Sequence, residues 1–176
     1  MVKSVIIFIA GTILFVWHTW ATSLKDKRLH GIFRFFSFEC NLALILLNAR
    51  YWFFAPFRPL QIFSWICLVA SIFPAVLGFY LLKKFGRSKR KFEETTSLVS
   101  NGIYGYIRHP MYASLILVGL GAFLKNISLP TALLVCLNMI ALYLTAKADE
   151  KEMLGRFGGE YAAYMEKTRM FIPYIF

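Results

Sequence analysis

Residues 60–82 read LQIFSWICLVASIFPAVLGFYLL, a run of 23 residues without one charged side chain. A helix needs about 20 mostly apolar residues to cross the hydrocarbon core of a bilayer. This run is therefore typical of a transmembrane helix, and it places the chain among integral membrane proteins.

Other apolar runs meet or approach the same length: residues 2–20, 32–54 and 129–146. A shorter run, 111–124, fits either a short span or one arm of a helical hairpin with 129–146. Pro130 suits the first turn of the second arm. The pattern predicts an all-α fold, an integral membrane bundle of about five transmembrane helices.

The composition agrees with this class. Apolar residues make up 59% of the 176 residues and charged residues 16%, whereas soluble domains carry about 45–50% and about 25%. A formal net charge of +11 would suggest nucleic acid as the partner of a soluble protein. Here the basic residues lie between apolar runs, where they orient helices and meet lipid headgroups. We therefore expect membrane lipid as a partner and no nucleic acid.

Basic residues also predict the topology. Five spans place 16 of the 20 Lys and Arg on one side of the membrane, mostly within residues 25–34, 83–91 and 147–169. Lysine and arginine collect in cytoplasmic loops, so we expect the C-terminus on the cytoplasmic side. Residues 5–16 after Lys3 resemble a signal peptide. However, bulky side chains stand where small residues should mark cleavage, so this segment is predicted to stay as the first helix.

Cysteine usage argues against a metal centre. Cys40, Cys67 and Cys136 each lie inside an apolar run, without the spacing of a metal-binding motif. Buried cysteine commonly acts as a small apolar residue. We therefore expect no metal.

Residues 101–112, NGIYGYIRHPMY, form the first polar cluster with chemical potential. Pro110 can open a helix, which puts His109 at its N-cap and directs positive partial charge at a ligand. Gly102 permits close approach of the backbone, and tyrosines such as Tyr104 can stack on a planar ring. The alternative is an interfacial loop with aromatic anchors, which the residues alone do not exclude.

The second cluster is acidic, DEKE at residues 149–152. It fits either a solvated first helical turn or a carboxylate that faces inward to meet a cation. Residues 149–167 carry apolar side chains at spacings of three and four, so they predict an amphipathic helix. That helix either lies on the headgroups or folds back over a site.

Together the two clusters resemble a known family. Residues 108–112, RHPMY, preceded by LVSNGIY, and residues 149–173 with their DE, FG and IP elements resemble one superfamily of membrane methyltransferases. It includes isoprenylcysteine carboxyl methyltransferases and phospholipid N-methyltransferases. The resemblance covers about residues 96–173; the first spans are similar only in being hydrophobic.

The resemblance implies that S-adenosylmethionine binds at the cytoplasmic ends of the last helices and that a lipid-like methyl acceptor enters from the bilayer. It implies two sets of site residues. The cofactor-binding set is Gly102, Tyr104, His109, Pro110, Tyr112, Asp149 and Glu150. The catalytic set is Glu150, His109 and Arg108. Glu150, rather than Glu152, is expected to face the cofactor.

The length allows one membrane domain, residues 1–176. Within it we expect an N-terminal three-helix part (1–95) and, from the resemblance, a methyltransferase-like, cofactor-binding part (96–176). Two positions depart from the family pattern: Asp149 replaces the usual glutamate, and Thr145 stands where prenylcysteine carboxyl methyltransferases tend to carry arginine. Phospholipid amine and prenylcysteine carboxylate both remain candidate acceptors.

Two other functions compete with this interpretation. Sterol reductases that use NADPH share parts of the C-terminal pattern, although only residues 87–91 offer a basic cluster for the 2′-phosphate. A small transporter or scaffold would need paired ionisable residues at mid-membrane, and only Glu39 lies there. A helix–helix hydrogen bond or a pair with Arg34 is the simpler role for Glu39.

Overall fold

The computed structural model describes residues 2–23, 25, 28–86 and 96–175, and in these ranges the chain is built from helices. The α-helices are α1 (Val2–Thr22), α2 (His30–Leu47), α3 (Pro59–Phe85), α4 (Pro110–Leu124), α5 (Leu129–Phe157) and α6 (Gly159–Lys167). Two short 3-10 helices are η2 (Ala49–Tyr51) and η3 (Gly102–Gly105).

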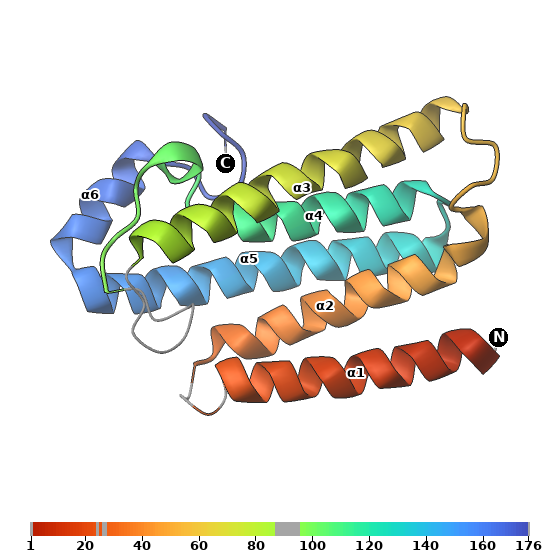
Figure 1. The fold of residues 1–176 in the computed structure, drawn as a ribbon, viewed down its shortest axis with the longest axis horizontal. Coiled ribbons are helices and arrows are strands. Elements are labelled where there is room, and N and C mark those ends of the chain that lie inside the picture. The colour runs from red at the N-terminus through yellow and green to blue at the C-terminus, as the bar shows by residue number, and fades with distance from the viewer. Residues whose placement is uncertain (1, 24, 26–27, 87–95, 176) are drawn as a thin grey trace.

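Helices α1 to α5 lie side by side, and successive helices run in opposite directions (Figure 1). Among the described residues, α1, α2, α3 and α5 are long and apolar enough to cross a membrane, whereas α4 has 15 residues. The predicted all-α membrane bundle is confirmed, and the chain is a multi-pass membrane protein. Helix α6, η3 and the C-terminus gather at one end of the bundle (Figure 1).

Two predicted boundaries differ from the structure. In the run 32–54 the α-helix ends at Leu47 and the short η2 follows. The buried Asn48 side chain between them donates to the carbonyl oxygen of Ala122 at 2.7 Å and fixes a turn there. The amphipathic segment 149–167 is not one helix: α5 continues through it to Phe157, and α6 starts anew after Gly158. Gly158 has a φ of 55°, a conformation that glycine adopts at little cost.

Polar side chains connect the helices inside the bundle. At the end of α4, the Gln61 side chain donates to the Lys125 carbonyl oxygen at 2.8 Å. The Ser64 hydroxyl donates to the Gly121 carbonyl oxygen at 2.7 Å. Asn138 accepts from Ser37 at 2.6 Å. Such bonds satisfy polar groups that lipid cannot solvate, and they fix the register of the helices that hold the site.

Gly119 permits the closest approach within this network. A Cβ atom there would lie 2.4 Å from Nδ2 of Asn138 and 3.0 Å from Oδ1 of Asn41. We expect Gly119→Ala to lower the free energy of unfolding by about 1–3 kcal/mol, the usual cost of overpacking. Gly155→Ala is the matched control, since it meets nothing within 4 Å on an exposed helical surface. Thermal melting in detergent should separate the two variants; equal melting temperatures would contradict the packing argument.

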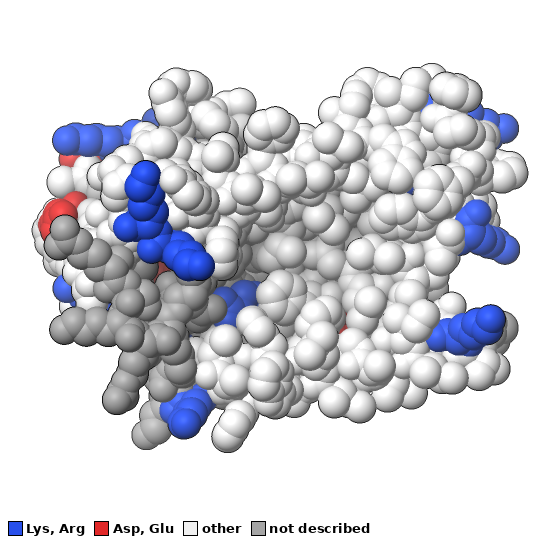
Figure 2. Space-filling view, viewed as in Figure 1, with Lys and Arg blue, Asp and Glu red and all other residues white. Residues whose placement is uncertain are grey.

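The charged side chains in view lie mostly toward the two ends of the bundle, with a broad uncharged belt between them (Figure 2). This distribution suits a bilayer-spanning protein. Lys27 and the basic residues of segment 87–91 lie outside the described residues. Glu39 accepts a hydrogen bond from Thr12 of α1 at 3.0 Å, so it links two helices, as expected from the simpler of its two roles.

Candidate active site

The RHPMY motif connects η3 to α4. Pro110 occupies the first turn of α4 and His109 is its N-cap, as predicted. The amide groups of Tyr112 and Ala113 both donate to the His109 carbonyl oxygen, so few helix N–H groups remain for a ligand. Gly102 has a φ of 58°, and a Cβ there would lie 2.8 Å from Leu81. The close approach that this glycine permits is therefore to α3.

The segment after α6 returns to the motif and pairs with it. Arg108 N donates to the Arg169 carbonyl oxygen at 2.8 Å, and His109 N donates to that of Met170 at 3.1 Å. Met170 and Phe171 are buried among residues of α4 and α5. Backbone pairing therefore fixes the motif against the C-terminal segment.

Helix α6 folds back over this end of the bundle. The Tyr164 hydroxyl donates to the Tyr104 carbonyl oxygen at 2.7 Å, and the Tyr104 hydroxyl donates to that of Gly78 at 3.3 Å. Burial raises the pKa of Tyr104, Tyr161 and Tyr164 above the ordinary value. All three hydroxyls consequently remain protonated donors at neutral pH.

Glu150 is the most buried acid of the cluster, with 3% of its surface exposed. Its Oε1 accepts a hydrogen bond from Arg108 Nε at 2.8 Å, and its Oε2 lies 3.4 Å from Lys147 Nζ. Arg108 also donates to the Thr168 carbonyl oxygen at 2.6 Å. The Glu150–Arg108 pair therefore joins α5 to the motif and to the segment after α6.

His109 lies beside this pair. Its Nε2 is 3.5 Å from Glu150 Oε1, an ion-pair contact, and has no closer hydrogen-bond partner among the described residues. The imidazole stacks on the Tyr112 ring, with centroids 5.4 Å apart and planes 13° apart. The imidazole is therefore held between the Glu150 carboxylate and the Tyr112 ring.

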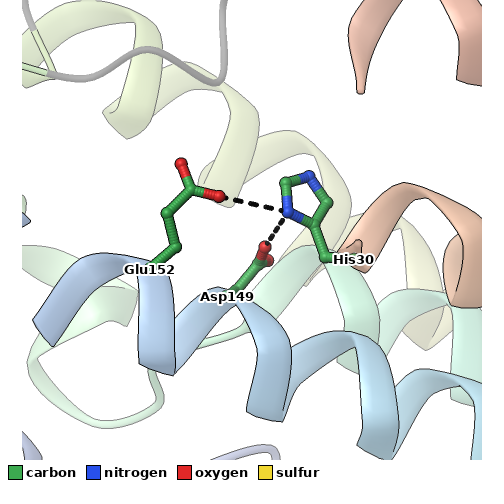
Figure 3. A group of neighbouring side chains, drawn as sticks. All are labelled: His30, Asp149 and Glu152. Atoms are coloured by element: carbon green, nitrogen blue, oxygen red, sulfur yellow. Dashed lines mark ion pairs between the residues drawn. The ribbon is translucent and has the colours of Figure 1, made fainter. Parts of the chain in front are cut away.

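Asp149 and Glu152 lie one helical turn apart on α5, and both contact His30 of α2 (Figure 3). His30 Nδ1 lies 2.9 Å from Asp149 Oδ1 and 3.4 Å from Glu152 Oε2. The other Asp149 oxygen accepts a 2.5 Å hydrogen bond from the Tyr112 hydroxyl. Glu152 also pairs with Arg156 at 2.8 Å.

The side chains of His30, Asp149 and Glu152 could also hold a metal ion, because one ligand atom from each lies within 4.8 Å of the others. Their present arrangement is a hydrogen-bonded ion-pair cluster. Arg28 Nε lies 3.4 Å from Glu152 Oε1, and a cation next to a carboxylate opposes a divalent ion. The expectation of no metal stays a prediction.

One cavity of about 540 Å³ lies at this end of the bundle. Six of the residues expected at the site line it: Tyr104, Arg108, His109, Pro110, Tyr112 and Asp149. Among the described residues, Glu150 and Gly102 are not in its lining, and Glu152 is. Glu150 lies behind the wall and holds Arg108, which differs from the expectation that it faces the ligand.

The N-terminal half contributes cavity residues that the motifs did not indicate. These are His18 of α1, Arg28 of the following connection, and His30, Arg34 and Phe38 of α2. Ala75, Phe79 and Leu82 of α3 add an apolar wall. In the sequence these residues carry no signal beyond a few polar side chains near the ends of two apolar runs.

Residues 60–160, more than half of the chain, match the family model for phospholipid methyltransferase. The chain belongs to the phospholipid methyltransferase family. Over 135 residues it is also 27% identical to the protein-S-isoprenylcysteine O-methyltransferase of Saccharomyces cerevisiae. That alignment covers 68% of this chain and 56% of the yeast protein, so the chain spans just over half the length of that relative.

The matched region of this phospholipid methyltransferase family member includes the RHPMY motif and the acidic cluster. It leaves out His30 and Arg28, which contact that cluster, and the 168–171 segment that pairs with the motif. The cavity is completed by residues on both sides of the matched region, such as His30 before it and Tyr161 and Tyr164 after it.

Proposed function

We propose that this chain is a membrane-embedded methyltransferase that uses S-adenosylmethionine and methylates a lipid-like or small apolar acceptor. The observation that carries the proposal is the cavity, whose lining joins the motif residues and acidic residues to apolar residues of the membrane helices. Family membership supports the same conclusion. The proposed architecture is one membrane domain in which residues 1–95 complete a site built mainly by residues 96–176.

The residues present fit that cofactor. A volume of about 540 Å³ lies within the range of small-molecule sites, about 300–1,000 Å³. Asp149 and Glu152 provide carboxylates for cationic groups, and tyrosine rings such as Tyr161 can attract a cation through their faces. His109 offers a buried nitrogen without a hydrogen bond to the described residues. Of the residues expected to bind the cofactor, Gly102 and Glu150 do not line the cavity and would support its wall from behind.

S-adenosylmethionine supplies, when bound, an electrophilic methyl group on a positively charged sulfur. The protein's part is to hold the acceptor in line and to exclude water, which can contribute about 7–11 kcal/mol. If the acceptor is an amine or thiol, His109 is the candidate proton acceptor. Arg108 and Glu150 would keep the motif that carries His109 in place.

An acceptor from the bilayer has a direct route to this site. Phe79 of α3 lines the cavity and is 49% exposed on a membrane-spanning helix. Phe38 of α2 and Leu115 of α4 also line the cavity. Apolar walls favour a lipid-like or small apolar acceptor, with phospholipid amine and prenylcysteine-type carboxylate as the two main candidate classes.

A binding titration tests the proposal against the reductase alternative. We expect purified, metal-depleted protein in detergent to bind S-adenosylmethionine saturably with one site, and NADPH far more weakly. Calorimetry measures both ligands on the same preparation. A folded sample that binds NADPH and ignores S-adenosylmethionine at millimolar concentration would reject the methyltransferase. Residues 87–91, the basic cluster that could bind the 2′-phosphate of NADPH, lie outside the described residues.

We further propose that the cavity faces the cytoplasm, because the sequence places most basic residues at this end. In a background without Cys40, Cys67 and Cys136, Ser100→Cys and Ile127→Cys should label from opposite sides of sealed vesicles. Both positions are exposed and lie at opposite ends of the bundle. Cytoplasmic labelling is expected at Ser100, and labelling of both from one side would contradict the topology.

A further inference from the structure

His30 opens α2, and only 4% of its surface is exposed. It lies 30 residues before the region that matches the family model, yet it lines the same cavity as the motif. Its Nδ1 is within hydrogen-bond distance of Asp149, 2.9 Å, on a helix that is remote in sequence (Figure 3). The contact joins the N-terminal part of the chain to the acidic cluster.

Asp149 is held from two sides. Tyr112 of α4 donates to Oδ2 and His30 of α2 lies against Oδ1. Two hydrogen-bonding partners on opposite oxygens restrict both side-chain torsions of the aspartate, so its carboxylate has one preferred orientation at the cavity wall. The Tyr112 ring in turn stacks on His109.

These contacts form a continuous chain from α2 to the candidate proton acceptor: His30, Asp149, Tyr112 and His109. Each link is a polar contact of 2.5–2.9 Å or a stacked ring pair. All four residues line the cavity. Loss of the first link would leave the Asp149 carboxylate held by Tyr112 alone, so its orientation at the cavity wall would be less restricted.

We propose that His30 is a positioning residue of the active site. Through Nδ1 it fixes the Asp149 carboxylate, and through Asp149 and Tyr112 it fixes the wall that receives the cofactor. The proposal rests on the proposed function, and it assigns to the N-terminal part of the chain a specific role in the site.

Three substitutions of His30 in the full chain test the role. An asparagine amide nitrogen can take the place of Nδ1, whereas the glutamine nitrogen corresponds to Nε2 and alanine offers no donor. We expect His30→Ala and His30→Gln to weaken S-adenosylmethionine binding by at least 10-fold and at most about 100-fold, because the energy of one hydrogen bond to a charged group sets the upper limit for an effect passed on through Asp149. His30→Asn should stay within about 3-fold of the unsubstituted protein, which corresponds to less than 0.7 kcal/mol.

Leu29→Ala is the matched control, because Leu29 precedes His30 and is 68% exposed. It should leave affinity and melting temperature unchanged. The decisive result is rescue by asparagine but not by glutamine at similar melting temperatures, since general destabilisation would not follow the position of the donor nitrogen. A poorly folding His30→Ala leaves the comparison of asparagine with glutamine intact.

The outcomes separate the two proposals. If the unsubstituted protein fails to bind S-adenosylmethionine, the proposed function is wrong whatever His30 does. If it binds and all three variants bind equally well, His30 has no positioning role. Equal losses in the asparagine and glutamine variants would also overturn the role, because they would show that the Nδ1 hydrogen bond is not what matters.

Discussion

Replacing Glu150 with glutamine is expected to lower the free energy of unfolding by about 3–5 kcal/mol, the typical cost of removing one partner of a buried ion pair. Glu150 is 3% exposed and Arg108 has 9% of its side chain exposed. Without the carboxylate, the Arg108 guanidinium keeps its charge but loses its counterion in a site with little water. Thermal or denaturant unfolding in detergent measures the loss.

Glu152→Gln provides the comparison on the same helix. Its side chain is 26% exposed and contacts Arg156, Arg28 and His30. Pairs that water reaches contribute up to about 1 kcal/mol each, less than a buried pair. Combining Glu150→Leu with Arg108→Met should recover part of the stability, since apolar replacements of a buried pair are often tolerated. Similar losses from Glu150→Gln and Glu152→Gln would refute the buried-pair role.

Asp149→Asn is expected to act on binding rather than on stability. Asparagine keeps the shape and can still accept from Tyr112, but it removes the negative charge from the cavity wall. We expect S-adenosylmethionine to bind about 10- to 100-fold more weakly, as for loss of a hydrogen bond to a charged group. The free energy of unfolding should fall much less than for Glu150→Gln, because the Asp149 side chain is 20% exposed.

The control for this binding effect is Glu160→Gln, an equal change of charge at an exposed position of α6. Calorimetric titration of the two variants should give clearly different dissociation constants. If both lose affinity to the same small extent, Asp149 affects binding only through net charge, and its place in the site would have to be withdrawn.

The membrane helices could be predicted from the sequence because their signal is local. Long apolar runs and the prolines at 110 and 130 mark helices directly, so α3, α4 and the start of α5 lie close to the predicted ranges. The early end of α2 could not be predicted, because it depends on a hydrogen bond from Asn48 to α4. That contact joins residues 74 positions apart, and no local pattern records it.

The faces on which the acidic residues lie depend on where α5 ends. If α5 continues through residues 149–152, Asp149 and Glu152 share a helical face and Glu150 points about 100° away. The structure places Asp149 and Glu152 at the cavity and Glu150 against Arg108. Had residue 149 started a separate helix, this shared face would not follow; which of the two glutamates meets the cofactor stays a prediction.

His30 and Arg28 had no comparable signal. They lie in the part of the chain where the family resemblance was limited to hydrophobicity, and their partners are more than 110 residues away. Only the packing of α2 against α5, which lie side by side in the bundle, brings them to the acidic cluster (Figure 1). Site residues that depend on such packing need a structure.

The backbone pairing of the motif with residues 169 and 170 bears on how the protein is made. During synthesis these residues leave the ribosome after all five bundle helices, which by then are available for insertion into the bilayer. Until they emerge, Arg108 and His109 lack the backbone partners that fix them, and Arg108 lacks the Thr168 carbonyl oxygen that it binds. A nascent chain therefore carries an unfinished pocket, and the pocket matures only once translation has passed α6.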